Sequence, residues 1–214
     1  MKRIVILLLA ILLLFSACGS KPSVSPPAPP ETPAPSEPVS PAPAPETPAG
    51  PIALPALTVE VVVSWEDADP ILGELGTLSA LLAESLSLQG YETEGITVTV
   101  NTAGGFTGDA LSSGGVDIAL LPTVDYVSCE EDTFAVLMTE DEPCTGVVAV
   151  SCLREDLDEA FRAALAAALL DTEPGQEFLE ICSPDFSYEP ATAEALQAVK
   201  DWMAKHVHPE HGGN

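Results

Sequence analysis

VDIALLPTVDYVSCEEDTFAVLM, residues 116–138, sets two apolar runs on either side of a short polar and aromatic segment. Val116 to Leu121 predicts a buried strand, Thr123 to Cys129 one or two turns of helix, and Thr133 to Met138 a second strand. A strand, a helix and a further strand in close succession are typical of parallel pairing with a right-handed crossover. The stretch therefore predicts an α/β protein.

Strand-like and helix-like runs also alternate before and after residues 116–138. They predict a single domain over residues 56–208, followed by a tail at 209–214. We predict a mostly parallel sheet of about five strands with one antiparallel strand, which is the run 146–151, and helices on both faces. Further strands are expected at 57–65 and 96–101, and helices at 71–88, 106–113, 157–170, 176–181 and 192–207.

The N-terminus has the pattern of a bacterial lipoprotein signal. Lys2-Arg3 precede an apolar run from Ile4 to Phe15, and Ser16-Ala17 lead directly into Cys18. The run is too short to cross a hydrocarbon core of about 30 Å as a helix. We expect residues 1–17 to be removed and Cys18 to be lipidated, which places the protein outside the cytoplasm on the bacterial cell membrane. An ordinary cleaved secretory signal is the alternative.

Residues 18–55 are rich in proline among alanine, serine, threonine and glutamate. Such a composition lacks the apolar residues that a core needs and favours an extended, partly polyproline II chain. We therefore expect a disordered tether that holds the domain away from the membrane. The alternative is a proline-rich ligand for an aromatic groove.

The formal net charge of −26 falls on the residues after Pro55, because acidic and basic residues balance before it. Only Arg154, Arg162, Lys200 and Lys205 oppose that charge. A surface this acidic repels nucleic acid and anionic lipid headgroups, so neither is expected as a partner.

Three junctions between a strand and a helix are candidate ligand contacts, because helix N-termini at the carboxyl edge of a parallel sheet present free N–H groups. Core packing is the alternative for each aromatic residue, and helix capping for each threonine. The candidate ligand-binding residues are Trp65, Gly104, Gly105, Phe106, Thr107, Thr123 and Tyr126.

The segment ALSSGGVDIALLP, residues 110–122, resembles the A-L-x-x-G-x-V-D-I-A-x-L-x-P segment of periplasmic solute-binding proteins of ABC transporters, in particular the phosphate, phosphite and phosphonate group. Phe106 and Tyr126 fall where that group has aromatic residues, and DTEPG at 171–175 is similar to its T-D-P-E-G helix link. The resemblance implies a type-2 periplasmic-binding fold, which normally has two lobes and of which one is expected here, together with a small-molecule solute, an ABC permease as partner and no catalysis.

The sequence departs from that family in two ways. The interval 139–145, where the second lobe normally begins, is too short for a lobe, so solute binding is expected to be weak unless a partner supplies the other wall. The rim is also acidic, which suits a cationic amine better than a phosphonate. Its carboxylates are Glu66, Asp67, Asp69, Asp109 and Asp125.

Signals for catalysis are absent from the sequence. There is no Gly-x-Ser-x-Gly, no His-Glu-x-x-His and no phosphate-binding loop, and no cofactor is expected. His206, His208 and His211 near the C-terminus are not expected to bind a metal. The alternative function is a surface interaction lipoprotein that keeps the scaffold without binding a ligand.

Four cysteines follow Cys18, and they allow three disulfide connectivities. A helix after a parallel strand ends at the opposite edge of the sheet, which separates Cys129 from Cys144 by about 20 Å at ~3.3 Å per residue. A bridge between these two is excluded, because disulfide Cα atoms lie within about 7 Å. An antiparallel strand at 146–151 would bring Cys152 beside Cys129, so we expect a Cys129–Cys152 disulfide. All four thiols would stay free in a reducing habitat.

Overall fold

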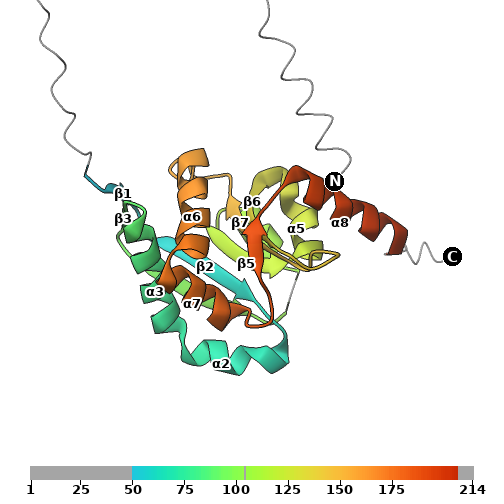
Figure 1. Cartoon of the computed structure of the whole chain (residues 1–214), viewed down its shortest axis with the longest axis horizontal. Helices are drawn as coiled ribbons and strands as arrows, with labels where there is room; N and C mark the ends of the chain where they lie inside the picture. The colour runs from blue at the N-terminus through green and yellow to red at the C-terminus, as the bar shows by residue number, and fades with distance from the viewer. Residues whose placement is uncertain (1–49, 104, 207–214) are drawn as a thin grey trace, which may run out of the picture. The chain divides into compact units, whose positions relative to one another are not determined.

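The computed structural model describes residues 50–103 and 105–206, and these form an α/β domain around a six-stranded mixed sheet (Figure 1). The strand order is β4-β2-β5-β7-β6-β8. The strands are β2 (Leu57–Val62), β4 (Ile96–Asn101), β5 (Ile118–Pro122), β6 (Thr133–Thr139), β7 (Gly146–Ser151) and β8 (Tyr188–Pro190).

The strand directions confirm the α/β class. The main sheet has six strands, one more than predicted. β2 pairs in parallel with both β4 and β5, while β7 is antiparallel to both of its neighbours, β5 and β6. β8 is antiparallel to β6, so two strands run backward rather than one. β8 was not predicted because it is three residues long and ends in proline.

Helices cover both faces of the sheet, as predicted. One apolar core joins Ile118 and Leu120 of β5 to α3, α6 and α7, and a second joins Ala119 and Leu121 to α4, α5 and α8. Successive residues of a strand point to opposite faces, which is why a fully apolar run fits this central strand. The helices are α3 (Leu75–Leu88), α4 (Thr107–Ser112), α5 (Thr123–Cys129), α6 (Glu159–Asp171), α7 (Glu173–Cys182) and α8 (Ala193–His206).

The helix predicted over 71–88 is divided in two. The 3-10 turn η1 (Trp65–Asp67) continues into α2 (Ala68–Gly73), and α3 starts again at Leu75 with a bend of 71°. Glu74 has non-helical backbone angles, φ −112° and ψ 10°, and its N–H closes α2 by donating to the carbonyl of Ile71. Within the described residues no single helix is long and apolar enough to cross a membrane, and this bent pair meets that test only when both parts are counted together.

The domain begins earlier than residue 56. β1 (Ile52–Leu54) pairs in parallel with β3 (Tyr91–Thr93), and Leu54 is buried in the core. The predicted end of the tether at residue 55 is therefore too late, because the apolar residues before Pro55 pair with a strand. The signal at 1–17, Cys18, the proline-rich segment before residue 50 and the tail at 209–214 lie outside the described residues.

The connection from β6 to β7 consists of residues 140–145 only, and Thr139 organises it. Its hydroxyl accepts hydrogen bonds from the backbone N–H of Thr145 at 3.0 Å and of Gly146 at 3.1 Å. Within the described ranges the chain thus forms a single lobe, as the short interval predicted.

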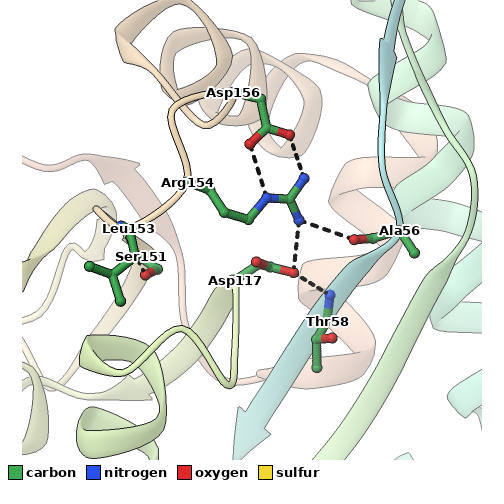
Figure 2. Close-up of polar contacts among 7 residues, drawn as sticks. All are labelled: Ala56, Thr58, Asp117, Ser151, Leu153, Arg154 and Asp156. Atoms are coloured by element: carbon green, nitrogen blue, oxygen red, sulfur yellow. Dashed lines mark hydrogen bonds and ion pairs between the residues drawn. The ribbon is translucent and has the colours of Figure 1, made fainter.

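A polar cluster around Arg154 joins the start of β2, the residue before β5 and the loop after β7 (Figure 2). Arg154 Nη1 lies 3.1 Å from Asp117 Oδ2 and donates to the carbonyl of Ala56 at 3.0 Å. Asp117 Oδ2 also accepts from the N–H of Thr58 at 2.8 Å, and Asp156 accepts from Arg154 Nε at 3.0 Å and from Nη2. The guanidinium beside Asp156 lowers the pKa of that carboxyl. The cluster therefore fixes the amino ends of the two central parallel strands.

Candidate functional site

A pocket of about 370 Å³ lies at the carboxyl ends of β2 and β5. The chain leaves β2 through α3 on one face and leaves β4 through α4 on the other, so the strand order reverses here. Ligands of open α/β sheets bind at such reversal points. The pocket is lined by Val62, Val63, Ser64, Glu66, Asp67, Pro70, Ile71, Leu120, Leu121, Pro122, Thr139, Thr145, Gly146, Ile181, Cys182, Ser183, Pro184, Asp185, Phe186 and Tyr188.

The lining has an aliphatic part and an acidic, hydroxyl-rich part. Side chains of the strands and of α2 supply the aliphatic part, while η1 and the loop 183–187 supply carboxylates. Asp67 accepts a hydrogen bond of 2.5 Å from the hydroxyl of Ser64, and both are exposed. Among residues 50–103 and 105–206, no lysine, arginine or histidine lines the pocket, so the described lining carries uncompensated negative charge.

Asp141 adds a further negative charge in the loop 140–145, next to the lining residue Thr145. Burial alone would raise the pKa of this carboxyl, but hydrogen bonds involving Thr139 and Thr145 outweigh that effect and lower it. The N–H of Thr145 lies 3.4 Å from Asp141 Oδ1, and Thr139 and Thr145 themselves line the pocket. The loop 140–145 is therefore held in shape by an ionised carboxylate.

Cys182 and Tyr188 line the pocket in their neutral forms. Burial raises the pKa of the Cys182 thiol to about 12, and burial likewise raises the pKa of Tyr188, whose hydroxyl donates to Ser183 Oγ at 3.1 Å. Because the thiolate is the nucleophilic form of cysteine, Cys182 is unreactive at neutral pH.

Three of the predicted ligand residues are buried and do not line the pocket. Tyr126 lies on the side of α5 that packs into the second core, and its hydroxyl accepts a hydrogen bond from the N–H of Ala135 at 3.2 Å. Helical spacing alone does not say which side of α5 faces the sheet, and Tyr126 is on the inner side. Thr107 is buried and donates to Glu60 Oε1, and Thr123 is buried with its hydroxyl 3.3 Å from Cys144 Sγ. None of the three lines the pocket.

Of the other predicted ligand residues that the structure describes, Trp65 adjoins the pocket in sequence, and Gly105 and Phe106 precede α4 and do not line it. Trp65 is 80% exposed between the lining residues Ser64 and Glu66, and Phe106 is 71% exposed just before α4. Gly105 has a positive φ of 69°, a backbone conformation that favours glycine, at the turn into α4. Gly104 lies outside the described residues.

The sequence did not predict that the segment 183–188 contributes to the pocket. This segment contributes Ser183, Asp185, Phe186 and Tyr188 to the pocket, although its residues are far in sequence from β2 and β5. Ser183-Pro184-Asp185 has the composition of a turn. That signal places a loop after α7 but does not say that the loop returns to the carboxyl edge of the sheet.

The predicted Cys129–Cys152 disulfide is not formed in the structure. Both residues are free thiols, as are Cys144 and Cys182. Cys129 is buried and donates to the carbonyl of Tyr126 at 3.3 Å, whereas Cys152 is exposed. The N–H of Cys152 does bond to the carbonyl of Asp132, close to the end of α5, because β7 runs antiparallel as expected. The backbone thus returns to the correct edge, but the Cys129 thiol turns inward.

No group of three or more histidine, cysteine, aspartate or glutamate side chains within residues 50–103 and 105–206 could hold a metal ion. His206 stacks on Trp202, with ring centroids 4.8 Å apart, and its Nδ1 lies 2.8 Å from the Trp202 carbonyl oxygen. His208 and His211 lie outside the described residues.

The fold resembles a solved structure of very different sequence. XAC2383 from Xanthomonas citri bound to chloride ion matches with a TM-score of 0.52 at 10% identity, over 70% of this chain and 96% of that one. The same protein bound to ATP gives a TM-score of 0.48 at 10% identity, over 72% and 99%. The sequence matches no protein-family model, and no curated protein matches it either. The likeness shows a shared α/β fold.

Proposed function

We propose that this protein is a membrane-anchored extracytoplasmic solute-binding or accessory lipoprotein of an ABC uptake system, without catalytic activity. The observation that carries the proposal is the pocket of about 370 Å³ at the carboxyl ends of β2 and β5, where the strand order reverses. That is the usual ligand position of open α/β sheets, and the volume is within the range of small-molecule sites.

The sequence supports a location outside the cytoplasm and an ABC permease as partner. The segment 2–18 has the features of a lipoprotein signal, and the segment 110–122 resembles the phosphate, phosphite and phosphonate-binding proteins of ABC transporters. A lipid anchor on a proline-rich tether would keep the domain near a permease while leaving it free to reorient.

The pocket is formed by a single lobe, and within the described residues no second lobe closes over it. A bound solute would keep part of its water, so we expect dissociation constants between micromolar and millimolar, about −8 to −4 kcal/mol. A permease or another partner that covers the rim would supply the second wall and raise the affinity.

A surface interaction lipoprotein without a ligand is the second candidate. It is favoured by large apolar side chains that are exposed on the domain, namely Trp65, Phe106 and Phe186. Exposed apolar side chains that gather into a patch mark contact surfaces for other proteins. The two candidates differ in whether a small solute binds to the chain by itself.

Replacing Cys18 by alanine should move the protein from the membrane fraction to the soluble fraction, because the acyl chains attach through this thiol. The far-UV circular dichroism and the melting temperature of the domain should stay unchanged, since β1 begins at Ile52, well after the anchor. Cys152→Ala is the matched control and should remain in the membrane, because Cys152 is an exposed thiol of the domain.

Detergent-dependent membrane association of the Cys18→Ala variant would contradict the anchoring part of the proposal. Saturable binding of a small solute at the pocket is its second requirement, and mapping that binding onto the backbone is the direct test.

A further inference from the structure

We propose that the pocket takes a small organic cation, an alkylammonium, with its charged end among Glu66, Asp67 and Asp185 and its carbon chain against the aliphatic lining. The inference rests on the proposed function, because it names the ligand class for the same pocket. The proposed ligand is a cation, whereas the resemblance to phosphonate-binding proteins implies an anionic ligand.

The first argument is that the described basic side chains lie elsewhere on the domain. Arg154 is held by Asp117 and Asp156 at the amino ends of β2 and β5, whereas the pocket is at their carboxyl ends. Arg162 lies 3.8 Å over the ring of Phe134 and donates to a backbone carbonyl. Lys200 pairs with Glu130 at 2.6 Å, and Lys205 is on α8. No described basic side chain therefore neutralises the carboxylates of the pocket.

The second argument is the chemistry of the lining. An ammonium group donates up to three hydrogen bonds, and the pocket offers oxygen acceptors on Glu66, Asp67, Asp185 and Ser183. Phe186, which lines the pocket and is 47% exposed, adds an aromatic face that attracts a cation. The acceptors and the aromatic ring belong to different segments that meet only in the fold.

The third argument separates an organic cation from a metal ion. Val62, Ile71, Leu120 and Ile181 give the same pocket an aliphatic wall, which a bare metal ion would not use. The described residues contain no group of three carboxylate, thiol or imidazole side chains with metal-binding geometry. A short alkyl chain that carries an ammonium group uses both parts of the lining.

An anionic solute is disfavoured by the same charges. A phosphonate would approach three carboxylates with no arginine, lysine or histidine in the lining, on a protein of net charge −26. Each like charge at 4 Å costs about 1 kcal/mol in water and more where water is excluded. Without a cation from a partner, the pocket therefore discriminates against anions.

The test is a titration of the full chain in detergent, carrying Trp202→Phe so that Trp65, beside the pocket, is the only tryptophan. The probes share size and differ in charge: propylammonium, 1-propanol, propionate and methylphosphonate. We expect a saturable change in Trp65 emission with propylammonium, and binding at least about tenfold weaker for the other three, or 1.4 kcal/mol. High salt should weaken the propylammonium response.

The double variant Glu66→Gln with Asp185→Asn should weaken propylammonium binding at least about fivefold. Its matched control, Asp69→Asn with Asp109→Asn, removes the same charge from two exposed carboxylates that do not line the pocket, and should change binding less than about twofold. Equal or tighter binding of methylphosphonate, or no effect of the double variant, would overturn the ligand class and leave solute binding standing. The absence of any saturable response up to about 0.1 M would overturn both.

Discussion

Gly175→Ala is expected to lower the free energy of unfolding by about 3 kcal/mol or more, the largest effect of a glycine-to-alanine change among the described glycines. Gly175 is in the first turn of α7, where its N–H donates to the Thr172 hydroxyl. A Cβ atom there would lie 1.9 Å from the carbonyl oxygen of Ala168 and 2.7 Å from Cα of Leu169. Both are backbone atoms of α6, so α7 itself must move.

Urea denaturation followed by circular dichroism measures the effect, and Gly76→Ala in α3 is the control. Nothing lies within 4 Å of a Cβ at Gly76, and alanine favours helix by about 1 kcal/mol over glycine, so this variant should be neutral or more stable. Equal midpoints for the two variants would show that α6 and α7 are not as close as the structure has them.

Arg154→Met is expected to destabilise the domain by about 2–4 kcal/mol, because it leaves a buried carboxylate without its counter-charge. The side chain of Asp117 is only 10% exposed and lies 3.1 Å from the guanidinium. Asp117 also holds the N–H of Thr58, so the start of β2 loses a support as well. Arg162→Met is the control, since Arg162 contacts a ring and a backbone carbonyl, and its loss should cost about 1 kcal/mol or less.

The pH dependence of stability separates this ion-pair effect from lost packing. Arg154 holds the pKa of Asp156 below its ordinary value of 3.8. A depressed carboxyl pKa in the folded state stabilises the fold above the unfolded pKa, and this is lost as the pH falls through the folded pKa. The wild-type chain should therefore lose stability more steeply below pH 4 than Arg154→Met. Parallel acid profiles for the two chains would contradict the ion-pair account.

The sequence predicted the central strands because their apolar runs are long and bounded by turns. The run 116–121 corresponds to β5 at Ile118–Pro122, and the run 133–138 to β6 at Thr133–Thr139. The antiparallel return at 146–151 was also predictable, since six residues cannot make a parallel crossover. Short elements without a periodic pattern, β1, β3 and β8, depend on tertiary pairing and were missed.

The pocket lies at the edge of the sheet where ligand contacts were predicted, but three of the predicted residues do not line it. Strand ends are visible in a sequence, so the edge followed from the βαβ pattern. Which side of a short helix faces inward is not visible, and so Tyr126, Thr107 and Thr123 were assigned to the pocket although they are buried elsewhere. The loop with Asp185 and Phe186 reaches the pocket only through the packing of α7, which local sequence does not determine.

Backbone NMR of the full chain during titration with propylammonium tests the central claim most directly, namely that a small solute binds at the reversal point of the sheet. The account predicts saturable shifts of amide signals at Val63–Asp67, Leu120–Leu121, Thr145–Gly146 and Ser183–Tyr188, with those around Arg154 unchanged. Titration with methylphosphonate should not change the chemical shifts of the same amide signals. Shifts concentrated at Tyr126 and Thr123, or spread evenly over the surface, would contradict the account.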